Sequence, residues 1–427
     1  MNKRKILKTA FMPGILGLMG TSLYVLGDTL IVGQALGREG LAALNLSIPM
    51  INIMQGLGLL LGFGGATALS RAVGRGDYNR AKQWAEKTLS WSVITGIILL
   101  IILQLFFNPL LELLTGGGEA IEGAKEYLGI LLWFSPFYVL FQTAVVLLRN
   151  DGGSKLAMKA LLLCSGINIV LDIVFVFGFS MGLYGAGIAT GIAQVIGLIV
   201  STLHFKNAVI LRGLQPKLLA PFKLMGKGMS SFVTEISQGI VIFAFNAILI
   251  SLVGGIGVSS YAIIANLSLM FTAVFLGLAQ GAQPILSEAF GAGDMRTFKE
   301  ALGYARNVNW VLSVIVVLVC IIIPKTMASI FITNDSQVLS MTTTGLRIYS
   351  LGFIFLGYNL IGSIELQSRA KNKEAFIFSL ARGMLVLISM ALLLTSIINI
   401  YGTWLAFFAS ELVGFIWLRT RNKESYI

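Results

Sequence analysis

The chain has 427 residues, of which 56% are hydrophobic and only 12% are charged. A soluble globular protein carries about 25% charged residues, so most of this surface cannot face water. The net charge of +12 does not indicate a nucleic-acid partner, because the basic residues are scattered between apolar runs. One histidine and two cysteines supply neither a disulfide framework nor a metal-binding spacing, so we expect no cofactor and no metal-dependent catalysis.

Runs of about 20 apolar residues predict membrane-crossing helices. In chain order, twelve such spans cover approximately 10–36, 44–70, 88–108, 127–148, 158–179, 183–204, 228–253, 258–287, 305–325, 345–367, 375–397 and 401–419. The basic start followed by an apolar run is similar to a signal peptide. No A-x-A cleavage site follows, and the run is too long, so we expect a retained first span. The sequence predicts an all-α membrane protein in contact with the lipid bilayer.

The 31 lysines and arginines are divided unequally between the two sides of the predicted membrane. Only four follow odd-numbered spans: Arg38, Lys125, Lys325 and Arg347. The remaining 27 precede the first span or follow even-numbered spans, and all of them are expected in loops or at span ends. By the positive-inside rule the rich side is cytoplasmic. We predict a multi-pass protein of the cytoplasmic membrane with both termini in the cytoplasm.

The two halves of the chain repeat one pattern. The segment GGATALSRAVGRGD at 64–77 matches GAQPILSEAFGAGD at 281–294, an offset of 217 residues. Each half contains six spans, so both run in the same direction, and the repeat axis should lie along the membrane normal. We predict a six-helix lobe at 1–205, a cytoplasmic linker at 206–227 and a second six-helix lobe at 228–427. A repeated pore is the alternative, but the polar residues of the spans are not repeated.

Polar side chains concentrate in the predicted spans of the first lobe. Asp28 (span one), Asn168 and Asp172 (span five) and Thr190 (span six) have similar depths, roughly 10 Å or more from the outer face. Carboxylates at that depth cost about 2.5–3.5 kcal/mol each. Two together repel unless a proton or cation lies between them, and oxygen donors suit a hard cation such as Na⁺. The set predicts a site for Na⁺ or H⁺; the alternative is a hydrogen-bonded helix-packing contact.

Three further carboxylates fall in the predicted spans of the second lobe. Glu235 lies in span seven, Glu365 in span ten and Glu411 in span twelve. Each could face a central cavity and meet a cationic substrate, or could be a protonated packing residue. The sequence leaves both interpretations open.

With these residues identified, the chain resembles the MATE (multidrug and toxic compound extrusion) family. The resemblance rests on GDTLIVGQALG, NIVLD, GAGIAT and AQGAQPILS in spans one, five, six and eight. It implies that Asp28, Asn168, Asp172 and Thr190 form the cation site of the first lobe. It also implies export of organic, often cationic, compounds driven by Na⁺ or H⁺. Glu235, in SSFVTEIS, matches a functional glutamate of some members, whereas Glu365 stands near a position where one branch has an aspartate.

Two other functions compete with drug efflux. A flippase for lipid-linked oligosaccharides of the same superfamily would need basic residues inside the lobes, and none is expected there. An intramembrane enzyme would need catalytic motifs, and we find none in the sequence. With a single histidine in the chain, acid–base catalysis by imidazole is not expected. We therefore predict a monomeric antiporter of small organic cations that is not an enzyme.

Overall fold

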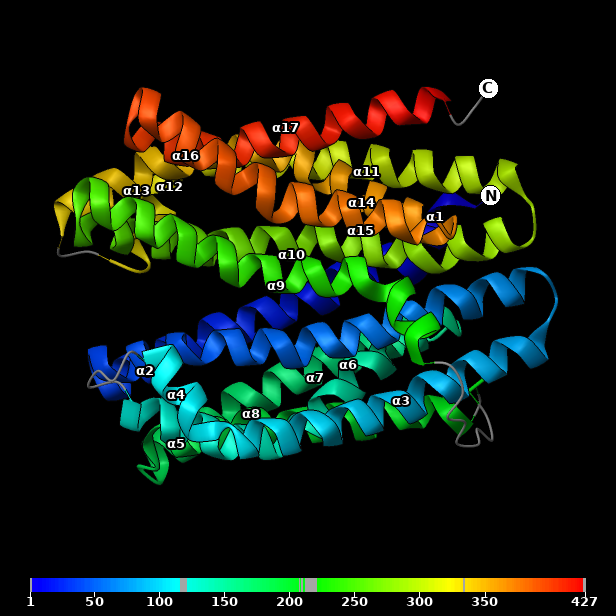
Figure 1. Ribbon diagram of the computed structural model, residues 1–427, viewed down its shortest axis with the longest axis horizontal. Helices are drawn as coiled ribbons and strands as arrows, with labels where there is room; N and C mark the ends of the chain where they lie inside the picture. The colour runs from blue at the N-terminus through cyan, green and yellow to red at the C-terminus, as the bar shows by residue number, and fades with distance from the viewer. Residues whose placement is uncertain are drawn as a thin grey trace.

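The computed structural model describes residues 2–115, 121–206, 208, 210–211, 221–332 and 335–424. Within these residues twelve helical stretches are long and apolar enough to cross a membrane. They form one bundle in which α2, α9 and α10 lie between the remaining helices of the two halves, and both termini lie at the same end (Figure 1). The predicted all-α class with twelve spans is confirmed.

The first half of the chain forms the first lobe. Its helices are α1 (Lys3–Ile6), η1 (Leu7–Phe11), α2 (Met12–Gly74), α3 (Tyr78–Leu105), α4 (Phe107–Thr115), α5 (Ile121–Leu131), η2 (Leu132–Phe134), α6 (Ser135–Asn150), α7 (Ser154–Asp172), η3 (Ile173–Gly178), α8 (Gly182–Thr202) and η4 (Leu203–Lys206). Half of the predicted linker at 206–227 lies outside the described residues, and residues 221–227 belong to helix α9 (Pro221–Val253). The predicted lobe boundaries stay predictions.

The second half forms the second lobe. Its helices are α9 (Pro221–Val253), α10 (Gly255–Gly291), α11 (Met295–Ile322), α12 (Pro324–Ser329), α13 (Ser336–Tyr349), η5 (Ser350–Gly352), α14 (Phe353–Ser368), α15 (Asn372–Leu380), η6 (Ala381–Leu385), α16 (Val386–Ile398) and α17 (Ile400–Glu424).

One glycine in each half reverses the chain between its first two spans. Gly37 interrupts α2 with φ 63° and ψ −147°, and Gly254 separates α9 from α10 with φ 68° and ψ −150°. This backbone region is open essentially to glycine alone, because a Cβ would clash there. The two glycines are 217 residues apart, so the repeat extends to the turns on the side opposite the termini.

The repeated segment at the other end of the bundle also has a structural explanation. Asp77 directly precedes α3, and its side chain accepts a hydrogen bond from the Arg80 backbone N–H at 2.9 Å. The Asp294 side chain accepts from the Thr297 backbone N–H, also at 2.9 Å, and begins α11. An aspartate at this position satisfies a backbone donor that the first helical turn leaves free. The repeat preserves the same helix start in both lobes.

Glycines let the two lobes touch backbone to backbone near the termini. A Cβ at Gly74 of α2 would collide with the backbone oxygen of Glu288 in α10, and one at Gly291 would collide with that of Arg71. Arg71 and Glu288 are themselves 217 residues apart. Such a reciprocal contact between equivalent residues is what a two-fold axis along the bundle produces, as the repeat predicts.

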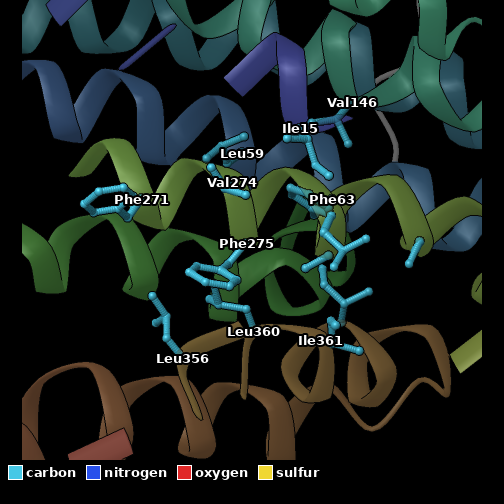
Figure 2. Close-up of a cluster of buried hydrophobic side chains, with 14 of the residues drawn as sticks. Ile15, Leu59, Phe63, Val146, Phe271, Val274, Phe275, Leu356, Leu360 and Ile361 are labelled. Atoms are coloured by element: carbon cyan, nitrogen blue, oxygen red, sulfur yellow. The ribbon is translucent and has the colours of Figure 1, made fainter. Parts of the chain in front are cut away.

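Apolar side chains from both lobes share one core at this interface. Ile15, Leu59 and Phe63 of α2 belong to the same buried cluster as Val274 and Phe275 of α10 (Figure 2). The lobes are therefore packed against each other over part of their length, and the polar site lies beyond this packed region.

Candidate cation and substrate site

The four residues predicted for the cation site come together between three helices. Asp28 extends from α2, Asn168 and Asp172 from α7, and Thr190 from α8, and all four are buried. The Asn168 Nδ2 atom donates a hydrogen bond to Thr190 Oγ1 at 3.2 Å. The carboxyl groups of Asp28 and Asp172 face each other and interact electrostatically. The four-residue spacing in α7 places Asn168 and Asp172 on one face of the helix.

Four oxygen atoms of this site accept no hydrogen bond from any described residue. They are Asp28 Oδ1, Asn168 Oδ1 and both carboxylate oxygens of Asp172, and all are buried. A buried acceptor without a donor is costly, and two facing carboxylates repel each other. A proton or a cation relieves both costs, and these oxygen ligands are of the type that a hard cation prefers. The residues therefore fit Na⁺ or H⁺.

The helix type changes directly after Asp172. The α-helix α7 ends at this residue, and the next turn, η3, is a π-helix. Insertions of this kind rotate the following residues around the helix axis and are frequent at functional sites. The apolar sequence after Asp172 gives no sign of the change.

Tyr127 of α5 also belongs to the site, although the sequence did not indicate it. Its buried hydroxyl faces Thr190, Asp28 and Asp172 without completing a hydrogen bond to a described residue. A tyrosine at the start of a predicted span is normally an interfacial residue. Only the packing of α5 against α2 and α8 turns its hydroxyl inward.

The cation site forms one wall of a cavity between the lobes. This space measures about 1250 Å³, and its lining includes Asp28, Tyr127 and Thr190 on the first-lobe side and Glu235 on the second-lobe side. A neighbouring space of about 780 Å³ lies within the second lobe. The two share five lining residues, Gln238, Ile242, Leu269, Thr272 and Leu276. We refer to the joined space as the central cavity.

The structure separates the three carboxylates predicted for the second lobe. Glu235 lines the central cavity, where its Oε2 atom accepts a hydrogen bond from Gln55 Nε2 of the first lobe at 3.0 Å. Glu365 is not among the cavity-lining residues, and its carboxylate pairs with Arg306 at 2.9 Å and Arg369 at 3.3 Å. Of the two interpretations left open for Glu365, the structure agrees with a packing role.

Glu411 lines the cavity together with Arg382, which the sequence predicted to lie in a loop or at a span end. Arg382 lies inside the span Asn372–Ile398, and its Nη1 atom is 2.6 Å from Glu411 Oε1. The prediction that every lysine and arginine lies in a loop or at a span end is therefore wrong. A charge within a span is tolerated when it is paired, and the partner here lies on another helix, where sequence spacing cannot reveal it.

Polar contacts join the lobes at the end that carries the termini. The Arg149 guanidinium donates to Gln280 Oε1, and Asn150 Nδ2 donates to Gln283 Oε1 at 2.8 Å. Arg71 Nη1 donates to the backbone oxygen of Gln367 at 3.0 Å. All three bonds connect the first lobe to the second, and with the glycine contacts they hold this end of the bundle together.

Comparisons with known proteins agree with this architecture. The MatE family model matches residues 13–174 and again residues 231–393, so it matches each half of the chain once. "Multidrug export protein MepA" of Staphylococcus aureus (strain MRSA252) is 25% identical over 389 residues, covering 88% of this chain and 84% of that protein.

Solved structures share the fold over nearly the whole chain. An outward-facing multidrug resistance MATE transporter of the MOP superfamily is 23% identical, with a TM-score of 0.90 over 99% of this chain and 96% of that one. A MOP superfamily transporter from Pyrococcus furiosus is 24% identical, with the same score and coverage. Since the family model covers well over half of the sequence, the chain belongs to the MatE family, whose members are transporters and not enzymes.

Proposed function

We propose that this protein exports a range of small organic compounds by antiport, driven by inward movement of Na⁺ or H⁺ through the site at Asp28 and Asp172. The observation that carries the proposal is the pair of facing, buried carboxylates whose oxygens lack donors, in a first lobe that opens onto the central cavity. The name of the Staphylococcus aureus relative, a multidrug export protein, supports the same function.

Coupling follows from the position of Asp28 in the cavity wall. Asp28 lines the cavity, whereas Asp172 and Asn168 lie behind it. Without a bound ion, the negative charge on the wall favours an organic cation in the cavity. A proton or Na⁺ between the carboxylates cancels that charge and weakens the attraction. Ion and substrate then bind with negative coupling, which is what an antiporter requires.

Ion binding is also expected to reshape the first lobe. Relief of the repulsion between Asp28 and Asp172 lets α2 and α7 approach each other, which reduces the first lobe's share of the cavity. The contacts that close the end carrying the termini define one conformation, and if the termini are cytoplasmic this conformation faces outward. The second lobe would then move mainly as a rigid body.

The charged residues of the cavity favour cationic substrates. Asp28 and Glu235 have no basic partner among the described residues, whereas Glu411 is balanced by Arg382. The rest of the lining is mainly apolar and aromatic. A lipid-linked oligosaccharide flippase is the second candidate, because Arg382 lies within the membrane span. Its pyrophosphate group would need several cationic donors, and among the described lining residues Arg382 is the single basic one.

Transport into or out of proteoliposomes tests the proposal. Purified protein is reconstituted, a fluorescent lipophilic cation is loaded, and Na⁺ and pH gradients are imposed separately. We expect dye movement against its own gradient with one of the two ions and none in protein-free vesicles. Dye movement that neither gradient accelerates would contradict antiport, and movement of only a lipid-linked pyrophosphate would support the flippase.

A further inference from the structure

Arg382 is a cation in the substrate cavity that the proposed export of organic cations does not use. It lies 10 residues after Asn372, the first residue of its span, so roughly 15 Å along the helix axis. It sits in the π-helical turn η6, next to Gly383, and both residues line the cavity. Only 8% of Arg382 is exposed.

The hydrogen bonds of Arg382 leave part of its guanidinium open. Of the three guanidinium nitrogens, only Nη1 donates a hydrogen bond to Glu411, and it does so to Oε1. The other carboxylate oxygen of Glu411 accepts a hydrogen bond from Asn359 Nδ2 at 2.7 Å. The Nε and Nη2 atoms donate no hydrogen bond to a described residue. They are also absent from the set of fully buried polar atoms that lack a partner, so both atoms retain some exposed surface. A guanidinium has five N–H donors in a planar fork. The unused part of this fork is therefore accessible from the cavity.

A half-buried arginine of the same lobe, Arg306, provides a contrast. Arg306 pairs with Glu365 at 2.9 Å, and its guanidinium covers the ring of Tyr358 at 4.6 Å from the ring centre. Neither Arg306 nor Glu365 lines the central cavity. Pairing with a glutamate thus does not by itself place an arginine on the cavity wall, and Arg382 differs in lining it.

Aromatic residues line the same space as Arg382. Tyr349 and Phe407 stack on each other there, with ring centres 4.4 Å apart, and Tyr261 is a third aromatic residue of the lining. Flat aromatic molecules pack well against such surfaces. A carboxylate attached to an aromatic system matches the fork of Arg382, because two parallel N–H donors fit its two oxygens.

We propose that Arg382 is a specificity-determining residue that recognises a carboxylate on aromatic substrates. The inference rests on the proposed export function and extends its substrate class to aromatic compounds that carry a carboxylate beside a cationic group. Such a molecule places its anionic end at Arg382 and its cationic end toward Glu235 and Asp28. Glu411 competes with the substrate carboxylate for the same guanidinium.

A pair of dyes that differ only in one charge tests this assignment. A rhodamine with a free carboxylic acid is compared with its methyl ester, both as substrates in proteoliposomes and by fluorescence polarisation on the purified protein. The wild type should bind and export both dyes. The Glu411→Gln variant removes the competing carboxylate and should lower the half-saturating concentration of the acid relative to the ester.

The double variant Arg382→Gln/Glu411→Gln removes the fork without leaving a buried charge unpaired. It should raise the half-saturating concentration of the acid relative to the ester by about tenfold or more, the effect of losing a charge-assisted hydrogen bond. The matched control Arg306→Gln/Glu365→Gln should keep the wild-type ratio of acid to ester. If the double variant does not fold, Arg382→Lys keeps the positive charge but not the fork and should shift the ratio in the same direction by a smaller factor.

The outcomes separate the inference from the function on which it rests. If the wild type exports neither dye, the proposed function fails. If it exports the ester but neither binds nor exports the acid, only the role of Arg382 fails. An unchanged ratio in both the double variant and Arg382→Lys would also overturn that role, because the carboxylate would then bind elsewhere.

Discussion

Buried carboxylates in this protein differ in their partners, and this difference separates function from packing. Glu365 is paired with two arginines and Glu411 with one, so their charges are balanced within the second lobe. Asp28 and Asp172 face each other, and three of their oxygens have no donor. A protein keeps such an arrangement at a cost of about 2.5–3.5 kcal/mol for each charge. An ion site accounts for that cost.

Neutralising either aspartate should stop ion-driven export without unfolding the protein. In Asp28→Asn or Asp172→Asn the cavity wall no longer changes charge when the ion arrives, so the gradient cannot drive efflux. The free energy of unfolding should stay equal or rise, because a buried charge without a partner is removed. Efflux from proteoliposomes and thermal unfolding measure the two effects. The control is Glu126→Gln, an exposed carboxylate of α5; wild-type efflux by either aspartate variant would refute the site.

Removing the hydroxyl of Tyr127 should weaken ion binding. This buried hydroxyl lines the cavity together with Asp28 and Thr190 and has no hydrogen-bond partner among the described residues, so it is available to bond to the ion-bound site. A hydrogen bond to a charged group contributes about 1.5–3 kcal/mol. Tyr127→Phe should therefore raise the ion concentration for half-maximal efflux by roughly tenfold to a hundredfold. Tyr184→Phe is the matched control, because Tyr184 of α8 is 44% exposed. Equal ion affinities in the two variants would exclude Tyr127 from the site.

At the scale of helices, the packing of α2 against α10 depends on glycines at backbone contacts, among them the pair Gly74 and Gly291. Gly74 and Gly291 each lie against backbone atoms of the opposite helix, so no side-chain movement can make room for a Cβ. Close approach through small residues is a common way to pack membrane helices, because lipid supplies no hydrophobic force between them. These two positions therefore control how tightly the lobes close near the termini.

Alanine at Gly74 or Gly291 should hold that end of the bundle apart. The added methyl group forces the helices to separate, which shifts the protein away from the closed arrangement and lowers the transport rate. A cysteine at Ser287, which is fully buried here, should then react faster with a maleimide. The control is Gly303→Ala in α11, where no atom lies within 4 Å of the added Cβ. Unchanged cysteine reactivity in both glycine variants would contradict this role.

At the scale of the whole molecule, the proposed antiport cycle requires the inter-lobe contacts to break. Asn150 and Gln283 form one of these contacts at 2.8 Å, and the bonds of Arg149 and Arg71 lie at the same end. In each of these hydrogen bonds either both partners are uncharged, or only the arginine is charged. Such bonds contribute modestly to stability and can therefore break in each cycle.

Linking the lobes at this contact should arrest transport reversibly. The variant Asn150→Cys/Gln283→Cys is treated with a short thiol cross-linker, and efflux should stop until a reducible link is cleaved. The control pair Arg296→Cys/Glu300→Cys lies within α11 of the second lobe, where the two side chains are exposed and are joined at 3.2 Å. Cross-linking this pair should leave efflux running. Continued transport by the inter-lobe variant after complete cross-linking would show that the lobes need not separate there.

The sequence by itself determined the class of the protein, its twelve spans and four residues of the candidate cation site. Lipid forces each span to satisfy its own backbone hydrogen bonds, so apolar length translates directly into helices. Asp28, Asn168, Asp172 and Thr190 were found because a polar residue in such a span is costly and therefore conspicuous.

Only the tertiary structure decided which polar residues have partners. Glu365 and Glu411 look like Glu235 in the sequence, but arginines from distant segments balance the first two. The sequence predicted Arg382 in a loop or at a span end, and it did not single out Tyr127. The side chains they face come from other helices, and sequence periodicity carries no information about the rotation and approach of one helix relative to another.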